Sequence, residues 1–420
     1  MTSSLSLTRP LVHRTVLKNG LVVIVVENPV ADIVSARMLI RVGTGHESRS
    51  QSGLFALLTS LLTKGTERLS SMAIAEQVES IGASLGSDAS ADYSLLSLKT
   101  VSADFADMLA LAAELLLCSN FPENELSLER RLTLDSIRSM QEQPFTVAYN
   151  ALRAAMYGDH PYGFPGIGSE ASIQAITRED LQAAHATYFR PDNCVMVIAG
   201  RITPDQAADL VEQHLGHWTA PDQPIPSLVY PALPTMSQQQ TIAQATNQAI
   251  VIVGYVAPSV KDEAYSTLKL ISTYLGSGLS SRLFVELREK RGLAYDVSAF
   301  YPTRLSTSQF VTYMGTAPSN AAIALEGLRH EAERLCQDLL TEEELDAAKS
   351  KILGQYALGK QTNAQIGQLL GWYEALGLGI DFDETFQEKV KAITVDSLQA
   401  VAQQYLGNPH TVVLGPEPPR

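Results

Sequence analysis

The sequence contains few cysteines and no long hydrophobic run. Its three cysteines, Cys118, Cys194 and Cys336, lie far apart in the 420 residues. Such a set offers neither a disulfide framework nor a Cys-x-x-Cys metal site, so we expect a reducing compartment. No uninterrupted apolar run approaches the ~20 residues of a membrane span, and residues 1–9 lack a cationic-then-apolar signal pattern. These absences predict a cytoplasmic protein without a membrane partner.

Basic residues are also scarce. The chain has 31 Lys and Arg against 45 Asp and Glu, which gives a formal net charge of −14. This balance argues against nucleic acid as a partner and is compatible with a basic peptide or protein surface. With 45% hydrophobic and 18% charged residues, the chain can bury sizeable cores. Its length predicts roughly two to three domains.

Strand and helix patterns alternate along the first half of the chain. Two β-branched runs flank Asn19-Gly20 between Thr15 and Val26, which predicts a hairpin, and residues 33–42 are typical of a third strand. Apolar residues at helical spacing predict a helix over 71–82. Further predicted strands cover residues 83–86, 91–101 and 194–199, and further predicted helices cover 103–117, 123–140 and 177–188.

A proline-rich segment separates two similar halves. Five prolines fall between residues 218 and 240, which predicts an extended linker. Ala175–Tyr188 matches Ala392–Tyr405 at an offset of 217, and a β-rich strand follows each. This self-similarity predicts two homologous α/β halves, at residues 1–217 and 241–420. In the second half we expect a strand over 248–255 and a helix over 263–275.

One stretch of the first half resembles a known family. The residues that frame it are Gly43, Glu47, Gly53 and Lys64-Gly65-Thr66. They resemble the residues that bracket the zinc helix of the pitrilysin / mitochondrial processing peptidase family. That helix carries the motif H-x-x-E-H, in which two histidines bind zinc and the glutamate activates water. Counted back from Lys64, the motif falls on Ala56, Thr59 and Ser60.

These three residues cannot perform the chemistry of that motif. An alanine methyl has no lone pair, and neutral hydroxyls are poor zinc ligands. A threonine hydroxyl cannot accept a proton near neutral pH as a carboxylate can. Without the family, Gly53–Leu62 is a buried apolar helix with small polar residues on one side. We therefore expect this helix to hold no zinc.

The segment Leu126–Ile137 resembles the family's helix that supplies the third zinc ligand. There the ligand is a glutamate seven residues after another glutamate, so both face one side of the helix. Glu129 occupies the first position, and Ser136 stands where the ligand belongs. Four of the five expected groups are thus absent. An isolated helix glutamate such as Glu129 is usually a surface or hinge salt-bridge residue.

Other candidate sites have simpler interpretations. His160 belongs to a Pro/Gly-rich stretch, His160–Gly168, that also resembles the family, and we expect a structural histidine in a turn. His214 and His217 have no third metal ligand nearby. Gly276–Arg282 lacks the Lys-Ser/Thr ending of a phosphate-binding loop, so we expect a turn that allows close backbone approach.

The stretch Ser280–Tyr295 carries a second resemblance to the family. In active members an arginine and a tyrosine seven residues apart reach the substrate at the zinc, and Arg288 and Tyr295 match that pair. A guanidinium can hold a carbonyl or carboxylate, and a phenol can donate to a developing oxyanion. Without the resemblance, the charge run 288–291 is an ordinary solvated helix face.

The resemblance spans residues 16–414 and implies an α+β fold. It implies two homologous domains, each a mainly antiparallel sheet packed with helices, that form half of a clamshell. It also implies the non-catalytic, substrate-binding subunit of a heterodimeric zinc peptidase, inactive alone. Zinc would then lie in the partner chain, and Arg288 and Tyr295 would contact the peptide. In this chain we expect no cofactor.

Two other hypotheses stay open. The chain could be a structural or peptide-binding protein of the same fold, possible also as a homodimer. A protease that uses another nucleophile is disfavoured, because no Ser, Cys or His lies in a recognisable nucleophile motif. Genomic adjacency to an intact H-x-x-E-H homologue would favour the heterodimer.

Overall fold

A six-stranded sheet organises the first half of the computed structural model, which describes residues 11–416. Its strand order is β1-β2-β6-β3-β5-β4, antiparallel except for the parallel pair β2 and β6. The strands are β1 (Val12–Val16), β2 (Val22–Glu27), β3 (Val34–Ile40), β4 (Ser84–Ala89), β5 (Ser94–Thr100) and β6 (Cys194–Gly200). The predicted hairpin is confirmed as β1 and β2 around Asn19-Gly20.

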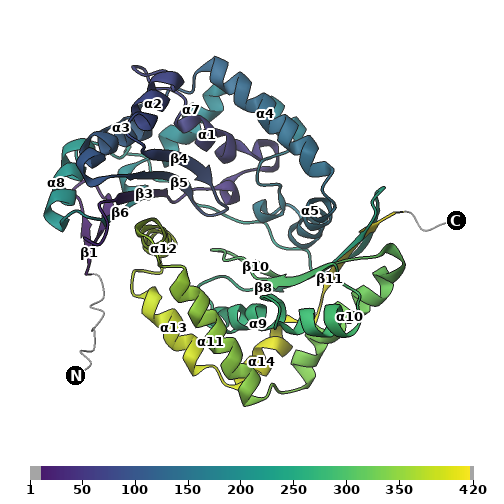
Figure 1. The fold of residues 1–420 in the computed structure, drawn as a ribbon. Helices are drawn as coiled ribbons and strands as arrows, with labels where there is room; N and C mark the ends of the chain where they lie inside the picture. Colours follow the sequence, from purple (N-terminus) through teal and green to yellow (C-terminus); the bar gives the residue numbers. More distant parts are fainter. Residues whose placement is uncertain (1–10, 417–420) are drawn as a thin grey trace, which may run out of the picture.

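Helices cover the outer face of this sheet. The helices of the first half are α1 (Leu54–Leu62), α2 (Ser71–Glu79), α3 (Phe105–Cys118), α4 (Glu123–Gln141), α5 (Pro144–Tyr157), α6 (Glu170–Ala175), α7 (Arg178–Tyr188) and α8 (Pro204–Leu215). Of these, α5 packs instead on the sheet of the second half. The largest core forms where the apolar faces of α1 and α3 meet alternate residues of β3, such as Met38 and Ile40. In Figure 1 this half is drawn in purple to teal, above the second half.

The second half repeats the same plan. Its sheet has the order β7-β11-β8-β10-β9, with β7 and β11 parallel. The strands are β7 (Gln239–Ala243), β8 (Ala249–Ala257), β9 (Asp296–Phe300), β10 (Ser308–Thr316) and β11 (His410–Gly415). The helices are α9 (Tyr265–Gly276), α10 (Ala321–Gln337), α11 (Glu342–Leu358), α12 (Asn363–Ala375), α13 (Phe382–Ala392) and α14 (Val395–Tyr405), and a π-helix, η6, spans Phe284–Lys290.

The two halves are structural repeats. The second sheet has the strand order of the first without β1, and the parallel pair recurs at the same place. Helices α7 and α14 correspond at the offset of 217 seen in the sequence. The predicted α+β class with two homologous halves is therefore confirmed. Residues 219–238 between them have no helix or strand, and Gln239 and Gln240 already belong to β7.

Each half contributes one helix to the other half's sheet. Helix α5 packs on β8 and β11, whereas α12 packs on β3 and β6 and lies between the two halves in Figure 1. The approach of α12 is so close that a Cβ at Gly371 would lie 2.4 Å from Leu39 Cδ1. This exchange buries the second face of both sheets and makes the halves interdependent.

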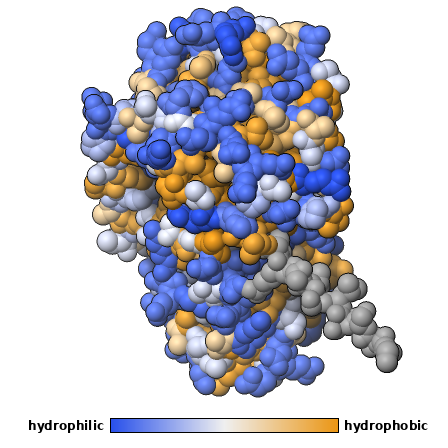
Figure 2. Space-filling view, turned by 90° about the vertical axis from the view of Figure 1, so that its left-hand side faces the viewer, coloured by the Kyte–Doolittle hydropathy of each residue, from blue (hydrophilic) through white to orange (hydrophobic). Residues whose placement is uncertain are grey.

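The molecular surface is mixed in character. Figure 2 shows several hydrophobic patches among hydrophilic residues on one face, which is usual for a globular protein. Within residues 11–416, none of the helices combines the length and the apolarity that a membrane crossing needs.

Candidate functional site

A buried carboxylate holds the start of α1. Gly53 enters the helix with φ 90°, a conformation that favours glycine. The two carboxylate oxygens of Glu47 accept hydrogen bonds from the N–H groups of Gly53 (2.8 Å) and Phe55 (2.9 Å). Burial raises the pKa of Glu47 to about 8, and the two hydrogen bonds oppose that rise. Two of the framing residues thus act together as the N-terminal cap of α1.

Of the three positions on α1 that would carry the zinc motif, Ala56 has no polar side-chain group, and the hydroxyls of Thr59 and Ser60 form hydrogen bonds within the helix. Thr59 Oγ1 donates to the carbonyl oxygens of Phe55 (2.9 Å) and Ala56 (3.1 Å), and Ser60 Oγ donates to that of Leu57 (2.8 Å). Thr59 is buried, as predicted for this helix, whereas Ala56 and Ser60 are half-buried. Neither hydroxyl proton is therefore directed at an external group.

The fourth position, Ser136, behaves in the same way. Its hydroxyl donates to the carbonyl oxygen of Leu132 (2.9 Å) in its own helix, α4. Helix α4 packs against α1, and Glu129 Oε1 lies 3.2 Å from Lys64 Nζ just beyond the end of α1. The salt bridge predicted for Glu129 is confirmed, but its side chain is 13% exposed and so is not at the surface.

These four residues do not fit zinc. An alanine methyl and three hydroxyls that donate to their own helices present no nitrogen, thiolate or carboxylate to a metal. Residues 11–416 also contain no group of three or more His, Cys, Asp or Glu side chains that could hold a metal ion. His214 and His217 accordingly have no third ligand. That the chain carries no zinc stays a prediction.

Arg288 and Tyr295 are neighbours in the structure. Arg288 Nη1 donates to the backbone carbonyl of Tyr295 (2.8 Å), and the Arg288 guanidinium lies 5.0 Å from the centre of the Phe284 ring. Both residues are exposed, Tyr295 by 62%. The backbone N–H of Tyr295 donates to Gly315 (2.8 Å), which places its phenol just before edge strand β9.

The polar ends of this pair remain open. Within residues 11–416 the Tyr295 hydroxyl has no hydrogen-bond partner, and the other N–H groups of Arg288 have none either. Tyr295 borders a hollow lined by the loop before β8 and by Glu142 and Pro144 of the first half. No hydrogen bond, ion pair or ring contact in the described chain joins the pair to the four degenerate positions. The pair can therefore bind a group from outside the chain.

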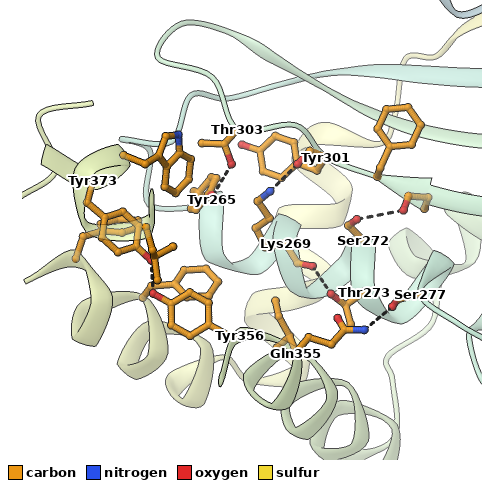
Figure 3. A pocket seen from close by; sticks show the side chains of 17 residues that line it. Tyr265, Lys269, Ser272, Thr273, Ser277, Tyr301, Thr303, Gln355, Tyr356 and Tyr373 are labelled. Atoms are coloured by element: carbon orange, nitrogen blue, oxygen red, sulfur yellow. Dashed lines mark hydrogen bonds between the residues drawn. The ribbon is translucent and has the colours of Figure 1, made fainter. Parts of the chain in front are cut away.

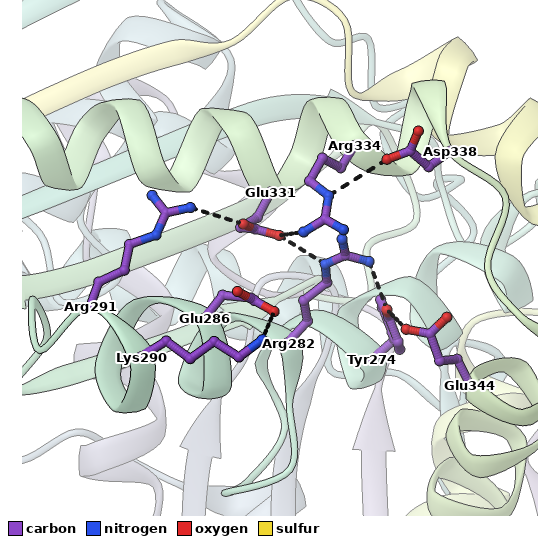
Figure 4. A network of polar contacts seen from close by, with 9 residues as sticks. All are labelled: Tyr274, Arg282, Glu286, Lys290, Arg291, Glu331, Arg334, Asp338 and Glu344. Atoms are coloured by element: carbon purple, nitrogen blue, oxygen red, sulfur yellow. Dashed lines mark hydrogen bonds and ion pairs between the residues drawn. The ribbon is translucent and has the colours of Figure 1, made fainter.

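A buried ionic network anchors the segment that carries Arg288 (Figure 4). The fully buried Glu331 of α10 accepts a hydrogen bond from Arg282 Nε (2.8 Å) and lies 3.7 Å from Arg291 Nη2. These two arginines flank η6 at its two ends. Arg334 of α10 also donates to Glu331 (3.3 Å). One carboxylate thus ties both ends of η6 to the domain core, and the sequence did not point to it.

His160 and Gly276 have the structural roles predicted for them. His160 is buried, its Nδ1 accepts a hydrogen bond from the Tyr162 N–H (3.1 Å), and its ring stacks on Tyr230 at 4.2 Å. Burial lowers the pKa of His160 to about 4. At Gly276 a Cβ would lie 1.9 Å from the backbone nitrogen of Ala299, so the expected close backbone approach is confirmed.

The fold is that of two-domain peptidases of known structure. A protease from Helicobacter pylori superposes with a TM-score of 0.90 at 24% identity, covering 97% of this chain and 100% of that one. A structure from Pseudomonas fluorescens, described as a peptidase M16 inactive domain, gives a TM-score of 0.90 at 25% identity, covering 97% and 99%. The class of protein is thus a peptidase-like one with a repeated α+β domain.

Sequence comparisons identify the family. The model described as Insulinase (Peptidase family M16) matches residues 22–169, and the model described as Peptidase M16 inactive domain matches residues 175–352. The uncharacterized zinc protease ML0855 of Mycobacterium leprae is 28% identical over 96% of this chain and 92% of the relative. The uncharacterized zinc protease YmxG of Bacillus subtilis is 26% identical over 96% and 98%. The chain belongs to the M16 peptidase family, which confirms the predicted resemblance.

Proposed function

We propose that this chain is the non-catalytic, substrate-binding subunit of a heterodimeric zinc peptidase. The observation that carries the proposal is a contrast within one chain. The positions expected for zinc chemistry offer only self-satisfied hydroxyls, whereas Arg288 and Tyr295 hold unused donors at the surface. A partner chain with the intact motif would supply the zinc, and this chain alone would be inactive.

Arg288 and Tyr295 suit the recognition of a peptide that undergoes hydrolysis. A guanidinium can hold a carbonyl oxygen through two N–H groups, and a phenol can stabilise an oxyanion as its charge develops. Edge strand β9 begins directly after Tyr295, and an edge strand can add an extended peptide through backbone hydrogen bonds. An extended peptide along β9 would therefore pass both side chains.

The cellular setting completes the proposal. We place the complex in the cytoplasm, since the three cysteines of the chain are few and none forms a disulfide. The partners are the zinc-bearing homologue and a peptide, with no nucleic acid or membrane. The chain could form a homodimer when purified alone, because homologous subunits share related faces.

Reconstitution with a homologue from the same organism that has an intact H-x-x-E-H motif tests this function. We expect no zinc by elemental mass spectrometry and no hydrolysis of a quenched-fluorescence peptide library by this chain alone, and hydrolysis after mixing. Arg288→Ala or Tyr295→Phe should lower the rate of the mixture about 100- to 1,000-fold, the usual cost of losing one oxyanion donor. Size-exclusion chromatography should show that both variants still bind the partner.

Arg329→Ala is the matched control. Arg329 is an exposed arginine on α10 whose one ion pair within residues 11–416 is with the nearby Glu333. This control should leave the rate unchanged. Stoichiometric zinc in the lone chain, or full activity of the Arg288 and Tyr295 variants, would overturn the proposal. A mixture that stays inactive while the lone chain binds peptide would favour the alternative, a non-enzymatic peptide-binding protein.

A further inference from the structure

A pocket of about 510 Å³ lies between helix α12 and the rest of the second domain (Figure 3). It is enclosed by α9, the end of β9 and helices α11 to α13. Eight of its 17 lining residues are aromatic, whereas aromatic residues make up 7% of the chain. A hydrogen bond between the hydroxyls of Tyr356 and Tyr373 closes one side. Its size and aromatic wall are those of a ligand site.

The pocket contains one charged side chain, Lys269 of α9. The Lys269 amine donates to the Tyr301 carbonyl (2.7 Å) and lies 5.4 Å and 5.3 Å from the ring centres of Tyr265 and Tyr301. No acidic residue lines the pocket. Burial and the nearby Arg304 lower the pKa of Lys269 to about 8, so the amine is still mostly protonated at pH 7.

Lys269 differs from two other enclosed cations, Arg282 and Arg153. Arg282 is paired with Glu331, and the buried Arg153 donates three hydrogen bonds to the carbonyl oxygens of Tyr162 and Phe164. The Lys269 ammonium has three N–H donors and uses one. Aromatic faces attract a cation but do not neutralise its charge. An anionic group that entered the pocket could accept hydrogen bonds from the unused N–H groups of Lys269 and balance its charge.

The pocket also lies in line with Tyr295. Tyr295 precedes β9, whereas Ala299, Phe300 and Tyr301 at the other end of β9 line the pocket. At ~3.3 Å per residue, a strand of this length spans roughly 16 Å, or about five residues of an extended peptide. A peptide lying along the β9 edge beside Tyr295 would therefore reach the pocket.

We propose that this pocket binds the C-terminal residue of a peptide, with the carboxylate on Lys269 and an aromatic or large aliphatic side chain against the aromatic wall. The inference rests on the proposed function for the peptide's path along β9. The charge of the pocket and its wall stand independently of that function. The site would select peptides by a free C-terminal carboxylate.

Binding to the lone chain tests this inference without any hydrolysis. Fluorescence anisotropy would compare a labelled decapeptide that ends in Phe with a free carboxylate and the same peptide with an amidated C-terminus. Loss of a charge-assisted hydrogen bond predicts about 10- to 100-fold weaker binding of the amide. Unlabelled 3-phenylpropanoate, a small carboxylate with an aromatic body, should compete with the acid peptide.

Lys269→Met should remove the preference for the acid and keep the apolar stem of the side chain. The matched control is Lys349→Met, because Lys349 on α11 also donates to a backbone carbonyl, that of Lys391, but lies outside the pocket. Circular dichroism melting would confirm that both variants fold. The comparison of acid and amide on the unaltered chain keeps the test valid if Lys269→Met fails to fold.

The outcomes separate the two proposals. Equal affinity for acid and amide, or unchanged preference in Lys269→Met, would overturn the inference about the pocket. Binding of 3-phenylpropanoate with no peptide binding would overturn the peptide as the ligand. Acid-selective binding in a chain that never activates a zinc-bearing homologue would support the pocket and overturn the subunit function.

Discussion

Equivalent regions of the two repeats differ in the hydrogen bonding of their polar side chains. In the first, α1 packs against edge strand β4, and its small polar side chains bond to their own helix. In the second, α9 packs against edge strand β9, where Lys269, Arg288 and Tyr295 keep donors unused. A helix can lose its zinc-binding side chains without a loss of stability when the hydroxyls that replace them hydrogen-bond to carbonyl oxygens of the same helix. Donors without a partner in residues 11–416 can bind a ligand, so the second repeat is where we expect function.

The largest expected effect tests the anchor of the second region. Glu331→Ala would leave three arginines around an empty, buried position and should lower the free energy of unfolding by about 3–5 kcal/mol. Glu286→Ala is the control, because Glu286 pairs with the exposed Lys290 and should cost about 0–1 kcal/mol. Urea unfolding measures both. Equal costs would show that Glu331 does not hold η6.

The next largest expected effect is on the rate of peptide hydrolysis. In the reconstituted complex, Arg288→Ala should cost about 3–4 kcal/mol in transition-state stabilisation. Ser60→Ala and Ser136→Ala should leave kcat/KM within twofold, since their hydroxyls serve only their own helices. Initial rates on one fluorogenic peptide give all three values. A large loss in either serine variant would contradict the contrast between the repeats.

A smaller effect follows from the cap of α1. The pKa of Glu47 is raised to about 8 in the fold, so the folded state binds more protons than the unfolded state between the two pKa values, and stability falls as pH rises there. The half-buried His46 and His185 and the buried His160, whose pKa values are each lowered to about 4, act in the opposite direction only below about pH 6.5.

Between pH 6.5 and 7.5, Glu47 should therefore dominate, because the lowered pKa of Lys269, about 8, opposes it only near pH 8 and above. We expect a loss of about 1 kcal/mol over this window, from nearly one proton at ~1.36 kcal/mol per pH unit. Glu47→Gln should flatten the dependence, whatever its effect on overall stability. Urea midpoints at several pH values would show it, and an identical slope in both proteins would contradict the assignment.

The smallest effect concerns the degenerate positions themselves. Thr59→Val keeps the shape of the side chain and removes a hydroxyl that bonds to carbonyls already used by the helix. We expect a change in unfolding free energy of less than about 1 kcal/mol by thermal melting. A much larger loss of unfolding free energy would mean that the Thr59 hydroxyl contributes more than hydrogen bonds within its own helix.

Local patterns in the sequence predicted much of the fold. Turn chemistry at Asn19-Gly20 and β-branched runs predicted the first strands, because these signals act between near neighbours. The offset of 217 predicted the repeat, whereas Arg288 and Tyr295 were identified by the family resemblance and not by their spacing. In the candidate site, once the family resemblance had located Ala56, Thr59 and Ser60, their residue types alone predicted that zinc chemistry is absent.

Only the tertiary structure decided the rest. The exchange of α5 and α12 depends on which sheet face remains open after each half has packed, a property of no single segment. The contact between Glu331 and Arg282 joins residues 49 apart, and the pocket around Lys269 gathers aromatic rings from α9, the end of β9 and helices α11 to α13. Periodicity reports which face of an element is apolar. It does not report which distant partner covers that face, and the enclosed charges of this protein depend on that choice.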